Sequence, residues 1–218
     1  MKGLEMLLYY RIWGQRAESF GFNSVYDAFK RLAKNPSVIA DMQEILSWAL
    51  DTTTVDGRVP DLPFPCPFEL HAQYGMREVL AGLGKANLET SGQTGVGIVH
   101  VPELKTYAVF ITFQKAEKEF SPTTMYADYP ISRTKLHWES QSTTAQASAT
   151  GQNLIRHGER GYTILIFARG TKKRSGVAVP YTYLGPANLQ EYSDERPIKI
   201  LWELVYPMPV EVFDDNRK

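Results

Sequence analysis

The chain has 218 residues, of which 43% are hydrophobic, and its formal net charge is zero. A chain of this length and composition can bury a substantial core, so we expect folded structure nearly throughout. The single cysteine, Cys66, excludes an internal disulfide or a thiolate zinc cluster and fits a reducing compartment. No apolar stretch approaches the roughly 20 residues of a membrane span, and the run from Leu4 to Tyr10 lacks a cleavage site for export. We therefore predict a cytoplasmic protein.

Residues 1–58 are predicted to form a helical lead-in subdomain. Ser24 and Asp27 form a capping box in front of one apolar helical face. Asn35 and Pro36 supply an N-cap and a first-turn proline for another helix, whose apolar residues recur every three or four positions. The expected helices cover residues 4–13, 25–34 and 36–50.

Residues 59–94 are predicted to be a connector with one short helix. The prolines at 60, 63, 65 and 67 cannot continue a helix, so this part of the chain is expected to be extended. Tyr74 to Leu83 is the expected short helix, and Gly84 closes it.

Residues 95–210 are predicted to be a β-rich recognition domain, followed by a flexible tail at 211–218. Apolar runs separated by polar turns indicate at least six strands, with a short helix near residues 150–157. The turn at 102–105 joins the first two strands as a hairpin. The expected fold class is α+β, with the helical segment followed by a strongly bent, mostly antiparallel sheet or a partly open barrel. The expected strands cover residues 96–101, 107–114, 136–141, 163–169, 179–184 and 198–205.

The stretch from Tyr126 to Gln141 is unusually rich in aromatic, hydroxyl, amide and basic side chains. This mixture suits nucleic acid, because aromatic faces stack on bases while polar groups hydrogen-bond to base edges. Strand alternation places Trp138 on the side of Leu136, toward the core, and His137 on the opposite side. The candidate nucleic-acid contacts here are Tyr126, Tyr129, Arg133, Lys135, His137, Ser140 and Gln141.

A second candidate surface is the basic segment from Arg156 to Arg174. It holds six basic residues against one acid, Glu159, a local charge of +5 on an otherwise neutral chain. Such a segment can contact phosphates, although a charged hairpin tip is often only solvated and the residues near 157–160 can simply cap a helix. The candidate contacts are Arg156, His157, Arg160, Arg169, Lys172, Lys173 and Arg174.

Enzyme signatures are weak in this chain. There is no P-loop, and the glycines near residue 95 have the wrong order for a dinucleotide fingerprint. A magnesium-dependent nuclease of the PD and E-x-K type can be mapped onto Asp61, Glu103 and Lys105, but such short patterns arise often by chance. We predict no catalytic residue, no metal site and no cofactor, and keep the nuclease as an alternative.

Six segments of the chain carry a resemblance to a known family, and they are Leu70 to Glu78, Phe120 to Tyr129, Leu136 to Gln141, Thr150 to Gly151, Ile164 to Arg169 and Pro180 to Gly185. In this order they resemble the DUF3427 family. The resemblance implies a domain found at the C-terminus of prokaryotic superfamily II helicases, often together with a phospholipase-D-like nuclease. It implies a DNA-recognition or targeting module of a restriction-like phage-defence system, with DNA and the helicase and nuclease domains of a larger protein or system as partners.

The late strands are also loosely similar to barrel domains of the SRA and PUA type, which bind flipped or modified bases. This analogy implies an aromatic pocket that receives an extruded nucleotide. Three hypotheses follow: a DNA-binding module that recognises modified DNA, a metal-dependent nuclease, or a structural adaptor that docks a helicase or dimerises through the helical third.

Overall fold

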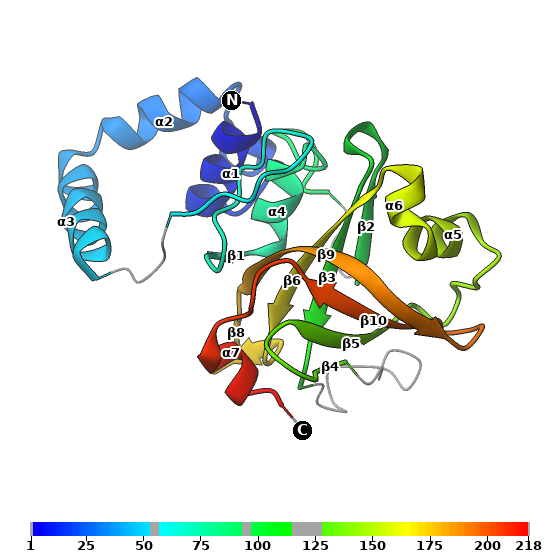
Figure 1. The fold of residues 1–218 in the computed structure, drawn as a ribbon. Coiled ribbons are helices and arrows are strands. Elements are labelled where there is room, and N and C mark those ends of the chain that lie inside the picture. Colours follow the sequence, from blue (N-terminus) through cyan, green and yellow to red (C-terminus); the bar gives the residue numbers. More distant parts are fainter. Residues whose placement is uncertain (1, 53–56, 93–96, 115–127, 218) are drawn as a thin grey trace. The chain divides into compact units, whose positions relative to one another are not determined.

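The computed structural model describes residues 2–52, 57–92, 97–114 and 128–217 (Figure 1). The chain divides into two compact units. The helical unit comprises Met1–Val59, Cys66–Glu69 and Gly75–Thr94, and the sheet unit comprises Pro60–Pro65, Leu70–Tyr74 and Gly95–Lys218. No helix in the described ranges is both long and apolar enough to cross a membrane.

The helical unit has the three expected helices, two of which begin at the predicted capping residues. The Ser24 side chain accepts a hydrogen bond from the Asp27 backbone N–H, which satisfies a donor that the first turn of a helix leaves unpaired. The predicted starts and ends are confirmed to within a few residues. The helices of this unit are α1 (Lys2–Trp13), the 3-10 turn η1 (Ala17–Phe20), α2 (Val25–Ala33), α3 (Pro36–Thr52) and α4 (Met76–Gly82).

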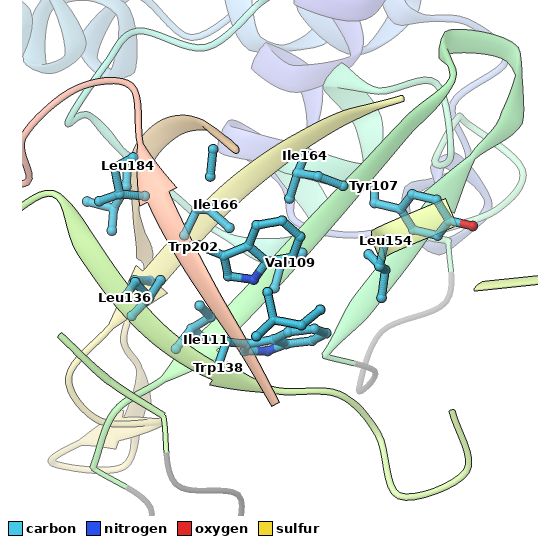
Figure 2. Close-up of a cluster of buried hydrophobic side chains, with 14 of the residues drawn as sticks. Tyr107, Val109, Ile111, Leu136, Trp138, Leu154, Ile164, Ile166, Leu184 and Trp202 are labelled. Carbon is cyan, nitrogen blue, oxygen red and sulfur yellow. The ribbon is translucent and has the colours of Figure 1, made fainter. Parts of the chain in front are cut away.

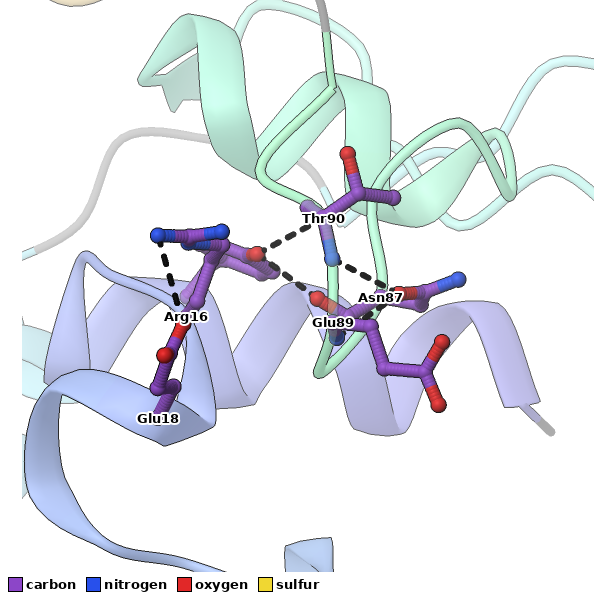
Figure 3. A network of polar contacts seen from close by, with 6 residues as sticks. Arg16, Glu18, Asn87, Glu89 and Thr90 are labelled. Carbon is purple, nitrogen blue, oxygen red and sulfur yellow. Dashed lines mark hydrogen bonds and ion pairs between the residues drawn. The ribbon is translucent and has the colours of Figure 1, made fainter.

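Helix α1 packs on α4 and on the loop that follows it. The Tyr10 hydroxyl lies 2.7 Å from the carbonyl oxygen of Asn87 and 3.0 Å from that of Thr90. The Asn87 side chain in turn accepts from the backbone N–H groups of Glu89 and Thr90, so the loop is held by its own amide (Figure 3). The loop therefore offers Tyr10 a fixed pair of acceptors, which its buried hydroxyl requires.

The sheet unit is built on one eight-stranded sheet of order β2-β3-β6-β9-β10-β5-β4, with β1 paired to β9. All its pairings are antiparallel except that of β3 with β6. Two outlying strands form a separate hairpin, β7–β8. The strands are β1 (Gln73–Tyr74), β2 (Ile98–Val101), β3 (Thr106–Thr112), β4 (Tyr129–Pro130), β5 (Lys135–Glu139), β6 (Thr163–Arg169), β7 (Lys173–Arg174), β8 (Val177–Ala178), β9 (Tyr181–Ser193) and β10 (Lys199–Leu204).

Short helical segments connect strands of the sheet unit, and one follows the last strand. The β2–β3 hairpin turns through the 3-10 segment η2 (Pro102–Leu104), and Lys105 adopts the left-handed conformation with φ 45°. Helices α5 (Ala149–Ile155) and α6 (His157–Arg160) precede β6, and α7 (Val210–Asp214) follows the last strand. Gly151 is required within α5, because a Cβ there would meet the carbonyl oxygen of Gln146 at 2.9 Å.

A core cluster of the sheet unit lies on one face of the sheet (Figure 2). Trp202 on β10 is fully buried and Trp138 on β5 is 4% exposed, with their ring centroids 6.3 Å apart. Leu154 of α5 covers this cluster and is itself fully buried. Burying each such side chain contributes on the order of 2–3 kcal/mol, so the two tryptophans anchor β5 and β10 to the other strands.

The predicted α+β class and mostly antiparallel sheet are confirmed. The sheet is not closed into a barrel: β2 and β4 are its edges, and within residues 97–114 and 128–217 no hydrogen bonds join them. Three features differ from expectation. Strand β9 continues to Ser193, strands β3 and β6 pair in parallel, and α7 occupies residues that were expected to form part of a flexible tail.

Candidate nucleic-acid interface

Strand β5 presents two different faces, as its sequence predicted. Leu136 and Trp138 are buried in the core, whereas Lys135, His137 and Glu139 alternate with them and are half-buried on the other side. The placement of Trp138 in the core is therefore confirmed. We call the opposite side of β4, β5 and β10 the outer face.

The outer face carries a stacked pair of rings. Tyr129 on β4 is the direct register partner of His137 on β5. Their ring centroids are 4.7 Å apart and the ring planes differ by only 12°. Leu201 of β10 is the register partner of His137 on its other side, so the imidazole lies in one row between an aromatic ring and an aliphatic side chain.

Backbone contacts hold this pair of strands in place. The Asp128 carboxylate, which is only 6% exposed, accepts a hydrogen bond of 3.1 Å from the Glu139 N–H. In the turn between the strands, the Ser132 hydroxyl accepts from the N–H groups of Thr134 and Lys135. These contacts fix the backbone from which the Tyr129 and His137 side chains extend.

Charges on the outer face occur in opposite pairs. Lys135 is the register partner of Glu203, and Lys199 is the register partner of Glu139. The Lys199 ammonium also lies 2.8 Å from an Asp194 carboxylate oxygen, and this hydrogen bond raises the pKa of Lys199. Because the charges alternate, this face lacks the single-sign field that grips a phosphate backbone over a long distance. Its chemistry is that of stacking and directional hydrogen bonds.

Other candidates from the same stretch have structural positions. Ser140 is 1% exposed, and its hydroxyl accepts a hydrogen bond from the Ile198 N–H at 2.9 Å. It therefore connects two segments inside the protein and does not lie on the surface. Arg133 lies in the β4–β5 turn and donates from Nε to the Met208 carbonyl oxygen at 2.8 Å. Gln141 is half-buried beside the turn that follows β5. Tyr126 lies outside the described residues.

The basic segment does not form one patch. Arg156 pairs with Glu159 at 2.6 Å beside α6, and Arg160 donates to Asn153. Lys173 and Arg174 are exposed in the β7–β8 hairpin, beyond the opposite end of β6 (Figure 1). Seven residues of strand separate the two groups, which is about 20 Å. The charge of +5 counted along the sequence is therefore divided in space.

Two further members of that segment face inward, and one lies in the loop after β6. The Arg169 guanidinium lies over the Tyr181 ring at 4.1 Å and donates to the Thr112 hydroxyl and the Val179 carbonyl. His157 is only 7% exposed, with Nδ1 3.2 Å from the Leu154 carbonyl oxygen. Burial lowers the pKa of His157, and hydrogen bonds with Leu154 and Asn188 oppose that shift. Lys172 is half-buried, and its carbonyl oxygen accepts from the Val179 N–H.

The nuclease alternative requires a metal site. In the part of the chain that the structure describes, no group of three or more His, Cys, Asp or Glu residues is arranged to hold a metal ion. Glu103 and Lys105 of the nuclease pattern lie in and just after the η2 turn, and Asp61 belongs to the segment Pro60–Pro65. The nuclease alternative stays a prediction.

Comparison with protein families gives a match over residues 68–215, which is more than half of the chain, to the domain of unknown function DUF3427. The chain belongs to the DUF3427 family. The matched residues include every strand of the sheet and the helices α4 to α7. Helices α1 to α3 lie outside the matched range.

Other comparisons add little to this DUF3427 assignment. No curated protein matches the chain. Two crystal structures of Arabidopsis thaliana SUVH6 in complex with SAM are similar to it, with 13% and 12% identity and TM-scores of 0.41 and 0.39. The matches cover 95% of this chain but only 38% and 36% of those chains. At such scores, the similarity assigns no role to the DUF3427 domain.

The DUF3427 domain also contains a polar and aromatic group that sequence reasoning missed, which we call the His100 cluster. The His100 ring stacks on Tyr107 at 4.4 Å with 8° between the planes, and its Nε2 lies 3.3 Å from the Tyr162 hydroxyl. Tyr107 accepts a hydrogen bond from Asn153, which accepts one from Arg160. The sequence contained one signal for this cluster. The predicted hairpin turn at 102–105 places His100 opposite Tyr107 on the paired strand.

Proposed function

We propose that this DUF3427 domain is a DNA-binding recognition module that uses its outer face to stack on and test a base. The Tyr129–His137 stack carries the proposal, because it places two flat rings on a half-buried, polar face that the core does not need. Each base–aromatic stack contributes about 1–3 kcal/mol. Such a surface can hold an unpaired or extruded base while neighbouring polar groups contact its edge.

Charge pairing on this face supports base recognition over simple phosphate attraction. Lys135 and Lys199 each lie opposite a carboxylate, so they add little long-range attraction. We infer that affinity depends more on the state of the base than on the length of the DNA. Modified or unpaired bases are the ligands this arrangement favours, since they cost least to expose. The family resemblance supports a place for the module in a helicase-nuclease defence system.

A binding screen tests the proposal. The probes are 20-base-pair duplexes and matching single strands, unmodified or carrying one modified cytosine or adenine, at low salt where phosphate contacts are strongest. We expect at least one probe to bind, and His137→Ala to weaken that binding by about tenfold or more. Tyr26→Ala is the matched control, because Tyr26 is 74% exposed in the helical unit. Absence of binding to every probe would remove the proposal.

Helix α3 favours a second function, self-association. None of its seventeen residues is buried. Exposed apolar surface of this kind marks interaction sites in soluble proteins. The charged residues of α3 are all acidic, whereas the last turn of α2 carries Lys30 and Arg31, so two copies of the α2–α3 pair can meet with opposite charges facing. Its large exposed apolar side chains are Ile45 at 62%, Leu46 at 57%, Trp48 at 67% and Leu50 at 76%.

Light scattering tests self-association directly. We propose that the chain is a dimer at tens of micromolar, and that Leu46→Glu converts it to a folded monomer. Ser47→Glu, on the polar side of the same helix, is the control and should leave the dimer intact. A wild-type chain that remains monomeric would refute this second function without affecting the first.

A further inference from the structure

The β4–β5 turn, residues 131–134, is held in place by the segment that follows β10. Met208, which is fully buried, donates its backbone N–H to the Arg133 carbonyl oxygen at 2.7 Å and accepts from Arg133 Nε at 2.8 Å. The Leu204 N–H donates to the Thr134 carbonyl oxygen at 2.8 Å. These three hydrogen bonds fix the turn and one side of the Arg133 guanidinium.

The other side of that guanidinium carries unused donors. Arg133 is exposed, and its contact with Met208 uses only the Nε–H. Throughout residues 2–52, 57–92, 97–114 and 128–217, no hydrogen bond or ion pair engages its two Nη groups. Because a guanidinium holds five N–H donors in one plane, the Nη groups form a rigid fork of four donors. Such a fork matches two oxygens of one phosphate.

The positive charge of Arg133 is also uncancelled. Its partner, the Met208 carbonyl, is neutral, and residues 131–134 contain no acid. Lys135, at the start of β5, differs because the strand register places it opposite Glu203. Of these two neighbouring cations, Arg133 is therefore the one that can offer its full charge to an anion.

Arg196 provides a matched comparison at the opposite end of the β5–β10 pair. It precedes β10, and it is also exposed and held through Nε by a backbone carbonyl, that of Ser142 at 2.9 Å. Its chain neighbours Asp194 and Glu195 are acidic and disfavour a phosphate there. Arg133 and Arg196 thus have the same anchoring and different electrostatic surroundings.

We propose that Arg133 binds a backbone phosphate of the DNA whose base is held at the outer face. Four residues separate Arg133 from His137, which is at most about 13 Å of extended chain. At 3.4 Å per nucleotide, this span places the phosphate about four nucleotides from the recognised base. The inference rests on the proposed function and adds a direction, since the DNA backbone then leaves the outer face over the β4–β5 turn.

Fluorescence anisotropy tests this contact with the duplex or single strand that binds best in the screen. Arg133→Gln is the main variant, because its amide N–H can still donate to Met208 while the charge and the Nη fork are lost. We expect it to weaken binding about five- to tenfold and to reduce the salt slope by about one counterion. Arg133→Lys should keep the salt slope. Arg196→Gln, the matched control, should bind like the wild type.

Neutral phosphate analogues locate the contact. A methylphosphonate replaces, one at a time, the six phosphates on each side of the recognised base. The wild type should lose affinity at one or two positions on one side, and Arg133→Gln should be insensitive to the same replacements. If Arg133→Gln does not fold, Arg133→Lys is scanned instead and should lose part of this sensitivity, because lysine lacks the fork. Equal sensitivity of the wild type and the scanned variant at every position would overturn the proposal.

The outcomes separate this inference from the proposed function. If Arg133→Gln binds like the wild type while His137→Ala loses affinity, the phosphate contact is refuted and the base recognition stands. If only Arg133→Gln loses affinity, with a normal melting temperature, the phosphate contact stands and the stacked base is refuted. Equal losses for Arg133→Gln and Arg196→Gln would indicate a general charge effect and overturn the inference. A wild-type chain that binds no probe removes both.

Discussion

The imidazole of His137 and the ring of Tyr129 lie within 12° of parallel because the backbone register of β4 and β5 places the two residues directly opposite each other. Their contact is therefore a property of the strand pairing and not of a chance rotamer. The next residue along β5, Trp138, faces the core. One strand thus carries a ring proposed for base recognition and a core ring at neighbouring positions.

Tyr129→Ala should weaken DNA binding by about tenfold or more, because it removes one stacking ring and frees His137 to rotate. Tyr129→Phe keeps the ring and should bind within about threefold of the wild type, a bound set by the loss of at most one hydroxyl contact. Anisotropy titrations measure both. A larger loss for Tyr129→Phe than for Tyr129→Ala would show that the hydroxyl, and not the ring, makes the contact.

Ser140→Ala should lower the free energy of unfolding by about 1–2 kcal/mol, because the buried Ile198 N–H loses its acceptor. The folded variant should bind DNA normally, in contrast to His137→Ala. Urea denaturation measures the first effect, with exposed Thr143→Ala as the control. A stable Ser140→Ala protein with impaired binding would restore Ser140 as a contact.

His157 should make stability fall in acid. Burial lowers its pKa in the folded state below the value near 6.5 of the unfolded chain, so below about pH 7 the unfolded state binds more protons. Stability is then full above about pH 7 and decreases as pH falls toward the folded pKa of His157. Urea titrations at pH 8 and pH 5 should show a larger loss for the wild type than for His157→Gln. Equal losses would place the pH sensitivity in other groups.

Removal of Arg11, the ion-pair partner of Glu78 in the helical unit, should lower the stability of the protein. Burial raises the pKa of Glu78, while Arg11, 2.8 Å away, lowers it. A raised folded pKa means that the contribution of Glu78 to stability is greatest below its unfolded pKa and decreases as pH rises through the folded one. Near pH 7 the carboxylate is ionised, and Arg11 offsets the cost of its burial.

We therefore expect Arg11→Ala to lower the free energy of unfolding by about 1–3 kcal/mol at pH 7, less than for a fully buried pair because Arg11 is half exposed. Glu78→Gln should cost less, since it leaves no buried charge. Thermal denaturation of both variants and of the double variant checks the order. A double variant less stable than Arg11→Ala alone would contradict it.

Local patterns predicted the elements well where each pattern had one structural cause. The N-cap at Ser24 and the alternation along β5 follow from backbone geometry within a few residues, so the sequence alone indicated them. The parallel pairing of β3 with β6 was not predictable in this way. It depends on how 50 intervening residues return to the sheet, and nothing local to either strand encodes that path.

The candidate site was only partly predictable for the same reason. Tyr129 and His137 are close in sequence, and a short turn brings them together. The His100 cluster joins residues from β2, β3, α5 and α6 with Tyr162, which precedes β6, so its members lie far apart in the chain. The residues of the basic segment are close together in sequence, but the extended strand β6 separates the two ends of the segment in space.

Strands β3 and β6 hold each other through seven register pairs from Thr106↔Thr163 to Thr112↔Arg169. Between these two strands in the chain come β4 and β5, which join the same sheet at its other edge, and α5, whose Leu154 covers the core. The residues proposed to touch the base therefore lie on strands that the core also needs. A change of base specificity has to keep Leu136, Trp138 and Leu154 and can alter the outer-face residues that alternate with Trp138 along β5.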